Sequence, residues 1–154
     1  MAAEILRGGG LVAFPTETVY GLGADALNAE AVGKVYAAKG RPSDNPMIVH
    51  ISQKGDMTKL TDGITPDMEK LMAAFWPGPL TMVVPAKDLI PRVTTGGLAT
   101  VGVRMPEDET ARALIAAAGT PIAAPSANLS GKPSPTRYSH VAEDLDGRID
   151  AIIA

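Results

Sequence analysis

The sequence predicts an α/β fold built on one sheet of mixed strand direction. Short apolar runs, of the kind that form buried strands, alternate along the chain with segments of helical periodicity. Several connections are too short for the helical crossover that joins parallel strands, so the sheet must also contain antiparallel pairs. The 154 residues fit a single domain with one core, and no internal repeat or linker interrupts them.

Six apolar runs predict the strands. The first ends at Pro15 and the third at Pro85, because proline cannot donate a hydrogen bond to a neighbouring strand. In chain order, the predicted strands are residues 11–14, 47–51, 80–84, 101–105, 122–124 and 149–153.

Four segments predict helices. Asn28 is a good N-cap for the first, in which Ala31 and Val35 fall on one face. Thr65 and Pro66 open the second, because threonine caps well and proline is tolerated at the first helical position. In chain order, the predicted helices are residues 28–39, 65–75, 107–118 and 139–145.

Composition excludes several classes of protein. No run approaches the roughly 20 apolar residues of a membrane helix, and the N-terminus is unlike a signal peptide, so we expect a soluble, cytoplasmic protein. Without cysteine there is no disulfide framework, thiol nucleophile or thiolate metal site. A net charge of −3 argues against binding nucleic acid mainly by phosphate neutralisation, but it allows a local basic groove.

Two polar loops, far apart in the sequence, contain the residue types of an anion site. In the first, Lys39 and Arg41 flank Gly40 at the end of a predicted helix, and Pro42 restricts the chain that follows. An arginine fork and a lysine point charge can reach a common anion. For Lys39 alone, a solvated cation near a helix C-terminus is the simpler interpretation.

The second loop combines hydroxyls, an amide and backbone donors. Ser126 and Asn128 lie between Pro125 and Gly131, a spacing that can form a cradle for a phosphate or carboxylate. Taken singly, each residue is more simply explained by a turn that satisfies its own backbone. Their clustering favours a binding site.

Thr16 and Thr18, just after the first predicted strand, are candidate substrate ligands or ordinary strand-end residues. Residues 21–26 formally match the dinucleotide-binding pattern G-x-G-x-x-G/A. However, five residues separate Pro15 from Gly21, whereas the true pattern places its first glycine in the turn directly after the strand. We therefore reject a dinucleotide site.

Arg104, near the end of its predicted strand, is a candidate fork for a carboxylate; the alternative is a salt bridge at the rim. His50 faces away from Val49 on its strand, and a lone strand histidine is more often structural than catalytic. His140 is expected at the surface. Neither histidine has carboxylates at metal-ligand spacing, so no protein-built metal site is predicted.

Six ordered segments together resemble the signature segments of the YrdC-like threonylcarbamoyl-AMP synthases. They are LVAFPTETVYGLG (11–23), KGRP (39–42), NPMIVHI (45–51), WPGPLT (76–81), VGVRMP (101–106) and PSANLSG (125–131). The resemblance implies one YrdC-like domain over residues 1–154, with a twisted open mixed sheet, helices packed on it and a concave, partly basic substrate face. It also implies synthesis of L-threonylcarbamoyladenylate from L-threonine, bicarbonate or CO₂, and ATP, which is the first step of threonylcarbamoyladenosine modification of tRNA.

The resemblance also assigns site residues, motif by motif. The family positions that contact nucleotide phosphates and take part in catalysis are matched by Lys39, Arg41, Ser126 and Asn128. Further ATP-binding positions are matched by Asn45, Thr100 and Ser134. The L-threonine-binding positions are matched by Thr18, His50 and Arg104, with Ala124 contributing its backbone.

The implied chemistry is mainly positional, because two anions must be held in line by fixed positive charge and hydrogen-bond donors. Mg²⁺ would arrive with ATP rather than in a protein cage. The expected partners are L-threonine, bicarbonate or CO₂, ATP and a downstream tRNA threonylcarbamoyl transferase complex, with no membrane association.

Two other functions stay open at this level: a non-catalytic module that binds double-stranded RNA or a nucleotide, and carbamoyl-adenylate synthesis as in hydrogenase maturation. Threonine-dependent release of pyrophosphate would separate the synthase from the non-catalytic module. Family members usually continue past a strand such as residues 149–153, and we expect this 154-residue form to lack that C-terminal segment. We therefore expect weak ATP binding, slow turnover, and a sheet edge that either frays or pairs with a second copy to form a homodimer.

Overall fold

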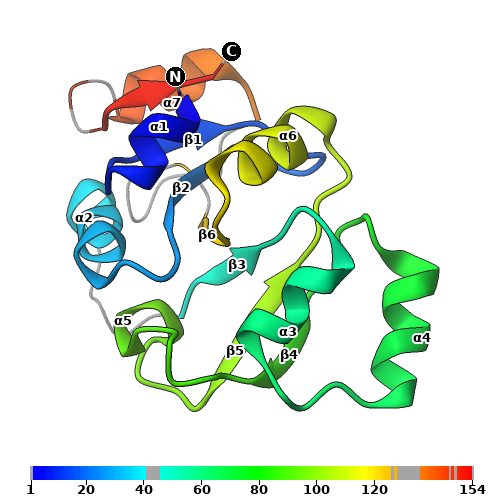
Figure 1. The fold of residues 1–154 in the computed structure, drawn as a ribbon. Helices are drawn as coiled ribbons and strands as arrows, with labels where there is room; N and C mark the ends of the chain where they lie inside the picture. Colours follow the sequence, from blue (N-terminus) through cyan, green and yellow to red (C-terminus); the bar gives the residue numbers. More distant parts are fainter. Residues whose placement is uncertain are drawn as a thin grey trace.

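One mixed sheet organises the molecule (Figure 1). The computed structural model describes residues 2–40, 46–125, 127, 136–145, 147 and 149–153. Within these residues, seven strands form the sheet in the order β4-β5-β3-β6-β2-β1-β7. The strands are β1 (Val12–Phe14), β2 (Gly21–Asp25), β3 (Ile48–His50), β4 (Met82–Pro85), β5 (Thr100–Arg104), β6 (Ile122–Ala123) and β7 (Ala151–Ile152).

Strand direction is mixed, which confirms the prediction. β1 pairs with β7 and β3 pairs with β5 in parallel, whereas the other four pairs are antiparallel. Each of the six predicted strands is present, with shifted ends. β4 ends at Pro85, as predicted, and Pro85 is its last residue, paired with Thr100. Proline is tolerated there because β4 lies at the edge of the sheet.

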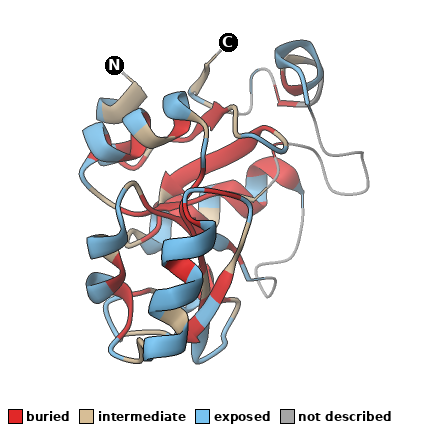
Figure 2. Ribbon diagram, turned by 90° about the vertical axis from the view of Figure 1, so that its right-hand side faces the viewer, coloured by how far each residue is buried: buried red, intermediate tan, exposed pale blue. Residues whose placement is uncertain are grey.

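Helices cover both faces of the sheet, and Figure 2 shows the strands as the buried layer between them. One face carries the larger apolar core, to which α2, α3, α4 and α7 contribute. The other face carries a smaller core, formed with α1 and α6. The described helices are α1 (Ala2–Arg7), α2 (Ala29–Lys39), α3 (Met57–Leu60), α4 (Pro66–Phe75), α5 (Arg92–Thr95), α6 (Glu109–Ala118) and α7 (Tyr138–Leu145), with a 3-10 turn η1 (Lys54–Asp56).

The helix ends follow their capping residues. Asn28 accepts a hydrogen bond from the Ala31 backbone N–H at the start of α2, as predicted. At the start of α4, Thr65 accepts one from the Met68 backbone N–H, also as predicted. At the other end of α2, Gly40 adopts a left-handed conformation with φ of 68°. This turn ends the helix directly after Lys39.

The segment after β1 differs from the prediction, because Gly21–Asp25 is a strand rather than part of a loop. β2 pairs antiparallel with β1 and brings Gly23 opposite Val12. A Cβ atom at Gly23 would lie 2.7 Å from the Phe14 ring, so this position accepts only glycine without rearrangement. Gly23, the second glycine of the rejected dinucleotide pattern, therefore serves close packing inside a sheet.

Candidate active site

Thr18, His50, Arg104 and Ala124, the four residues matched to L-threonine-binding positions, line one small cavity. Its volume is about 30 Å³, and the rest of its lining consists of Thr16, Val19, Gly21 and Pro125. The four matched residues come from the β1–β2 loop, from β3 and β5, and from the end of β6. Residues spread over more than 100 positions of the chain thus meet at one point.

Sheet register explains this convergence. β3 and β5 run parallel with His50 opposite Arg104, so the two side chains share a face of the sheet. On the other side of β3, the backbone N–H of Ala124 donates to the Ile48 carbonyl over 3.0 Å. The β1–β2 loop is held against this region because Ala127 donates to the Tyr20 carbonyl and Leu22 to the Pro125 carbonyl.

His50 is buried and uncharged at neutral pH. Its Nδ1 lies 3.2 Å from the Ile48 carbonyl oxygen, which can only accept, so Nδ1 carries the proton. The Phe14 ring meets it edge-on, with ring centroids 6.4 Å apart. Burial, and then the nearby positive charge of Arg104, lowers the pKa of His50 to about 4. A neutral imidazole can serve as a hydrogen-bonding group in the cavity without repelling Arg104.

The lowered pKa of His50 gives a pH prediction for stability. Between pH 6.5 and about 4 the unfolded chain binds a proton at His50 that the folded chain does not, so folding stability falls as the pH falls through this window. The loss is on the order of 3 kcal/mol in total. Urea unfolding at pH 7 and pH 4.5 should show a smaller loss for His50→Gln than for the wild type. An equal acid-induced loss in both proteins would contradict the burial of a neutral His50.

Arg104 is almost fully buried and has three partners in the protein. Its Nε donates to the Gly78 carbonyl over 3.2 Å, and its Nη1 donates to the Thr18 hydroxyl over 3.4 Å. Its Nη2 forms an ion pair with the Glu17 carboxylate. The structure shows the salt bridge that was the alternative interpretation of Arg104, and its role as the ligand of a substrate carboxylate stays a prediction. Sequence reasoning missed Glu17. Its position between two candidate threonines was the available signal.

The sheet face beside the cavity stays open. Ile48, Gly102 and Thr100 lie on the same face as His50 and Arg104, since alternate residues of a strand share a face. Ile48 is 39% exposed, and Thr100 is exposed as well. Opposite Gly102 lies Val83, which is 63% exposed. A ligand larger than the cavity can therefore extend from it along β3, β5 and β4.

The two polar loops are only partly described. Lys39 is the last residue of α2 and is 3% exposed, so the interpretation of a solvated cation was wrong. His140 is exposed on α7, as expected. The other predicted residues of these loops lie outside the described residues: Arg41, Asn45, Ser126, Asn128 and Ser134.

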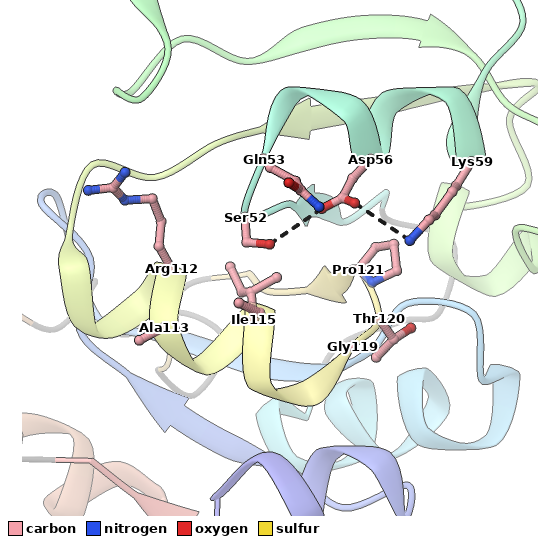
Figure 3. Close-up of a pocket in the computed structure, with 11 residues that line it drawn as sticks. Ser52, Gln53, Asp56, Lys59, Arg112, Ala113, Ile115, Gly119, Thr120 and Pro121 are labelled. Carbon is pink, nitrogen blue, oxygen red and sulfur yellow. Dashed lines mark hydrogen bonds and ion pairs between the residues drawn. The ribbon is translucent and has the colours of Figure 1, made fainter.

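A larger cavity of about 410 Å³ lies elsewhere, between α6 and the segment that follows β3 (Figure 3). It contains no predicted site residue. Its carboxylate, Asp56, already accepts from Ser52 at 3.4 Å and pairs with Lys59 at 3.5 Å. Because Asp56 is already paired within the protein, the volume alone does not make this cavity an active site.

The part of the chain that the structure describes offers neither a cluster of metal ligands nor a membrane-spanning helix. No group of three or more His, Cys, Asp or Glu side chains there is arranged to hold a metal ion. No helix there has the length and apolar character needed to cross a membrane.

The fold and the cavity define a class: an α/β protein with an open mixed sheet and a small polar cavity containing an arginine, a neutral histidine and threonine hydroxyls. The family model for Sua5, YciO and YrdC proteins, described as "Telomere recombination", matches residues 4–154. The chain belongs to this family.

Named relatives agree with the family assignment. The chain is 59% identical over 154 residues to threonylcarbamoyl-AMP synthase of Bacillus subtilis and 57% identical over 153 residues to that of Pyrococcus abyssi. The matches cover 99% of this chain but 44% and 45% of those proteins. A solved structure of P. abyssi Sua5 complexed with L-threonine superposes with a TM-score of 0.97 at 57% identity, covering 99% of this chain and 45% of that one. The chain thus spans less than half the length of these relatives.

Proposed function

We propose that the protein synthesises L-threonylcarbamoyladenylate from L-threonine, bicarbonate or CO₂, and ATP, with release of pyrophosphate. The observation that carries this proposal is the single cavity formed by Thr18, His50, Arg104 and Ala124. Relatives named threonylcarbamoyl-AMP synthase and a relative solved with L-threonine support it. The product would pass, in the cytoplasm, to the enzymes that modify tRNA.

The cavity fits one end of an amino acid. Of the five N–H groups of Arg104, three have partners among the described residues, which leaves two for a substrate carboxylate. The Thr18 hydroxyl and the neutral His50 can hydrogen-bond the amine and hydroxyl of threonine. The backbone of Ala124 closes the cavity from the side of β6.

ATP would occupy the open face beside this cavity. Ile48 and Val83 offer apolar surface to a nucleoside, and Thr100 lies at the start of β5 on the same face. Lys39, together with the residues proposed in the two polar loops, would supply positive charge and donors for the phosphates. Those loop residues are Arg41, Asn45, Ser126, Asn128 and Ser134. Mg²⁺ would enter as a complex with ATP.

The reaction needs positioning rather than a covalent enzyme intermediate. The threonine amine bonds to the carbon of CO₂ and loses a proton, which gives a carbamate. A carbamate oxygen then attacks the α-phosphorus of ATP, and the bond to the β-phosphate oxygen breaks to release pyrophosphate. Both partners are anions, so fixed cations and donors lower the barrier by holding them together and by stabilising the developing charge.

Discrimination between threonine and valine tests this proposal. Valine has nearly the same shape but lacks the hydroxyl, so its binding would leave polar groups of the cavity unpaired. We expect pyrophosphate release in bicarbonate buffer to favour threonine over valine by roughly 100-fold or more in kcat/KM. Calorimetric titration with each amino acid gives a second readout that does not depend on turnover. Equal rates and equal affinities for the two amino acids would contradict the proposed substrate.

A further inference from the structure

Glu17 links Arg104 to the main chain that precedes α6. One carboxylate oxygen, Oε1, accepts from Arg104 Nη2 in the ion pair described above. The other, Oε2, accepts from the backbone N–H of Glu107. Both side chains are largely removed from solvent, so the contact is shielded far better than an ion pair on an open surface. Glu17 thus bridges the guanidinium and the backbone just before α6.

The guanidinium is held from three directions. Gly78 accepts from Nε, Thr18 accepts from Nη1, and Glu17 accepts from Nη2. Among the described residues this leaves one N–H on each terminal nitrogen. A carboxylate is bound most specifically by two such parallel donors, provided that the plane of the guanidinium is fixed.

The loop that carries Glu17 is itself ordered by local hydrogen bonds. Thr16 donates its hydroxyl proton to the Val19 carbonyl over 2.6 Å, and the Thr18 backbone N–H donates to the Thr16 hydroxyl over 3.3 Å. Thr16, Thr18 and Val19 all line the cavity, whereas Glu17 does not. Its carboxylate is thus directed at Arg104 from beside the cavity.

We propose that Glu17 is a positioning residue that aims Arg104 at the substrate carboxylate and thereby sets the affinity for the amino acid. The inference rests on the proposed role of Arg104 as the ligand of that carboxylate. Without the negative charge of Glu17, the guanidinium would keep its neutral acceptors but lose its strongest partner. Affinity for the amino acid should fall, whereas affinity for ATP should not.

Two substitutions separate positioning from folding. Glu17→Gln keeps the length of the side chain and removes its charge, while Glu17→Asp keeps the charge and shortens the reach by one methylene. We expect Glu17→Gln to raise both the KM and the calorimetric Kd for L-threonine roughly tenfold or more, with the KM for ATP unchanged. Glu17→Asp should recover part of the lost affinity. The matched control is Glu109→Gln, which removes an exposed carboxylate on α6 and should change neither constant.

The outcomes distinguish this inference from the proposed function. If Arg104→Ala weakens threonine binding and Glu17→Gln does not, the positioning role is overturned and the role of Arg104 stands. If Arg104→Ala leaves threonine binding intact, the proposed carboxylate ligand is wrong. Should Glu17→Gln fail to fold, Glu17→Asp tests the positioning role instead. Weaker threonine binding with unchanged ATP binding would support that role, and unchanged binding of both ligands would overturn it.

Discussion

Replacing Arg104 with alanine is expected to lower kcat/KM for L-threonine by roughly 30-fold to several thousand-fold, the range for truncating one partner of a buried charge pair. The buried guanidinium is the one described cation that lines the cavity. Arg104→Lys should also lower kcat/KM for L-threonine, because a point charge cannot replace two parallel donors. The measurement is the rate of pyrophosphate release as a function of threonine concentration.

Removal of the Arg104 side chain also leaves the Glu17 carboxylate without its cation, so a loss of stability in the Arg104→Ala variant must be distinguished from a loss of threonine binding. A matched control separates the two effects. Arg112→Ala removes a second arginine, which lines the larger cavity instead, and should leave threonine kinetics unchanged. Thermal unfolding of each variant identifies the folded fraction. A folded Arg104→Ala protein with wild-type threonine kinetics would remove Arg104 from the site.

Replacing Phe14 with alanine is expected to destabilise the fold by about 3–5 kcal/mol. Phe14 is fully buried in the smaller core, its ring meets His50 edge-on, and Gly23 leaves room for that ring. The free energy of unfolding of a small domain is about 5–15 kcal/mol in total, so this one side chain accounts for a large share of it. Urea unfolding at pH 7 measures the effect.

Phe75→Ala is the control for Phe14. Phe75 ends α4 and is 55% exposed, so its removal should change the free energy of unfolding by less than about 0.5 kcal/mol. Similar losses in the two variants would mean that the packing of the smaller core against β1 does not govern stability.

Much of the fold could be predicted because periodicity and capping are local properties of the sequence. Asn28 and Thr65 mark helix starts, and each predicted apolar run contains a strand. β2 could not be predicted, because Gly21 and Gly23 have no strand preference of their own. At Gly23 the neighbouring Phe14 ring leaves no room for a Cβ atom, and that is a tertiary requirement.

The candidate site likewise combines residues that local pattern could predict with residues that it could not. Arg104 was a carboxylate candidate from its place at a strand end, whereas His50 and Ala124 entered only through the family resemblance. Local pattern could not show that β3 and β5 align His50 with Arg104, because the two residues are 54 positions apart. Glu17 was missed for a related reason: its partner Arg104 lies 87 positions away.

The identity of the product tests most directly whether the protein joins threonine, CO₂ and the adenylyl group of ATP, as we propose. The protein should be incubated with ATP, Mg²⁺, L-threonine and ¹³C-bicarbonate, and the products analysed by mass spectrometry. We expect an adenylate that contains threonine and one ¹³C atom, formed together with pyrophosphate and absent when threonine is omitted. Release of pyrophosphate from ATP that neither requires threonine nor incorporates ¹³C would contradict the proposal.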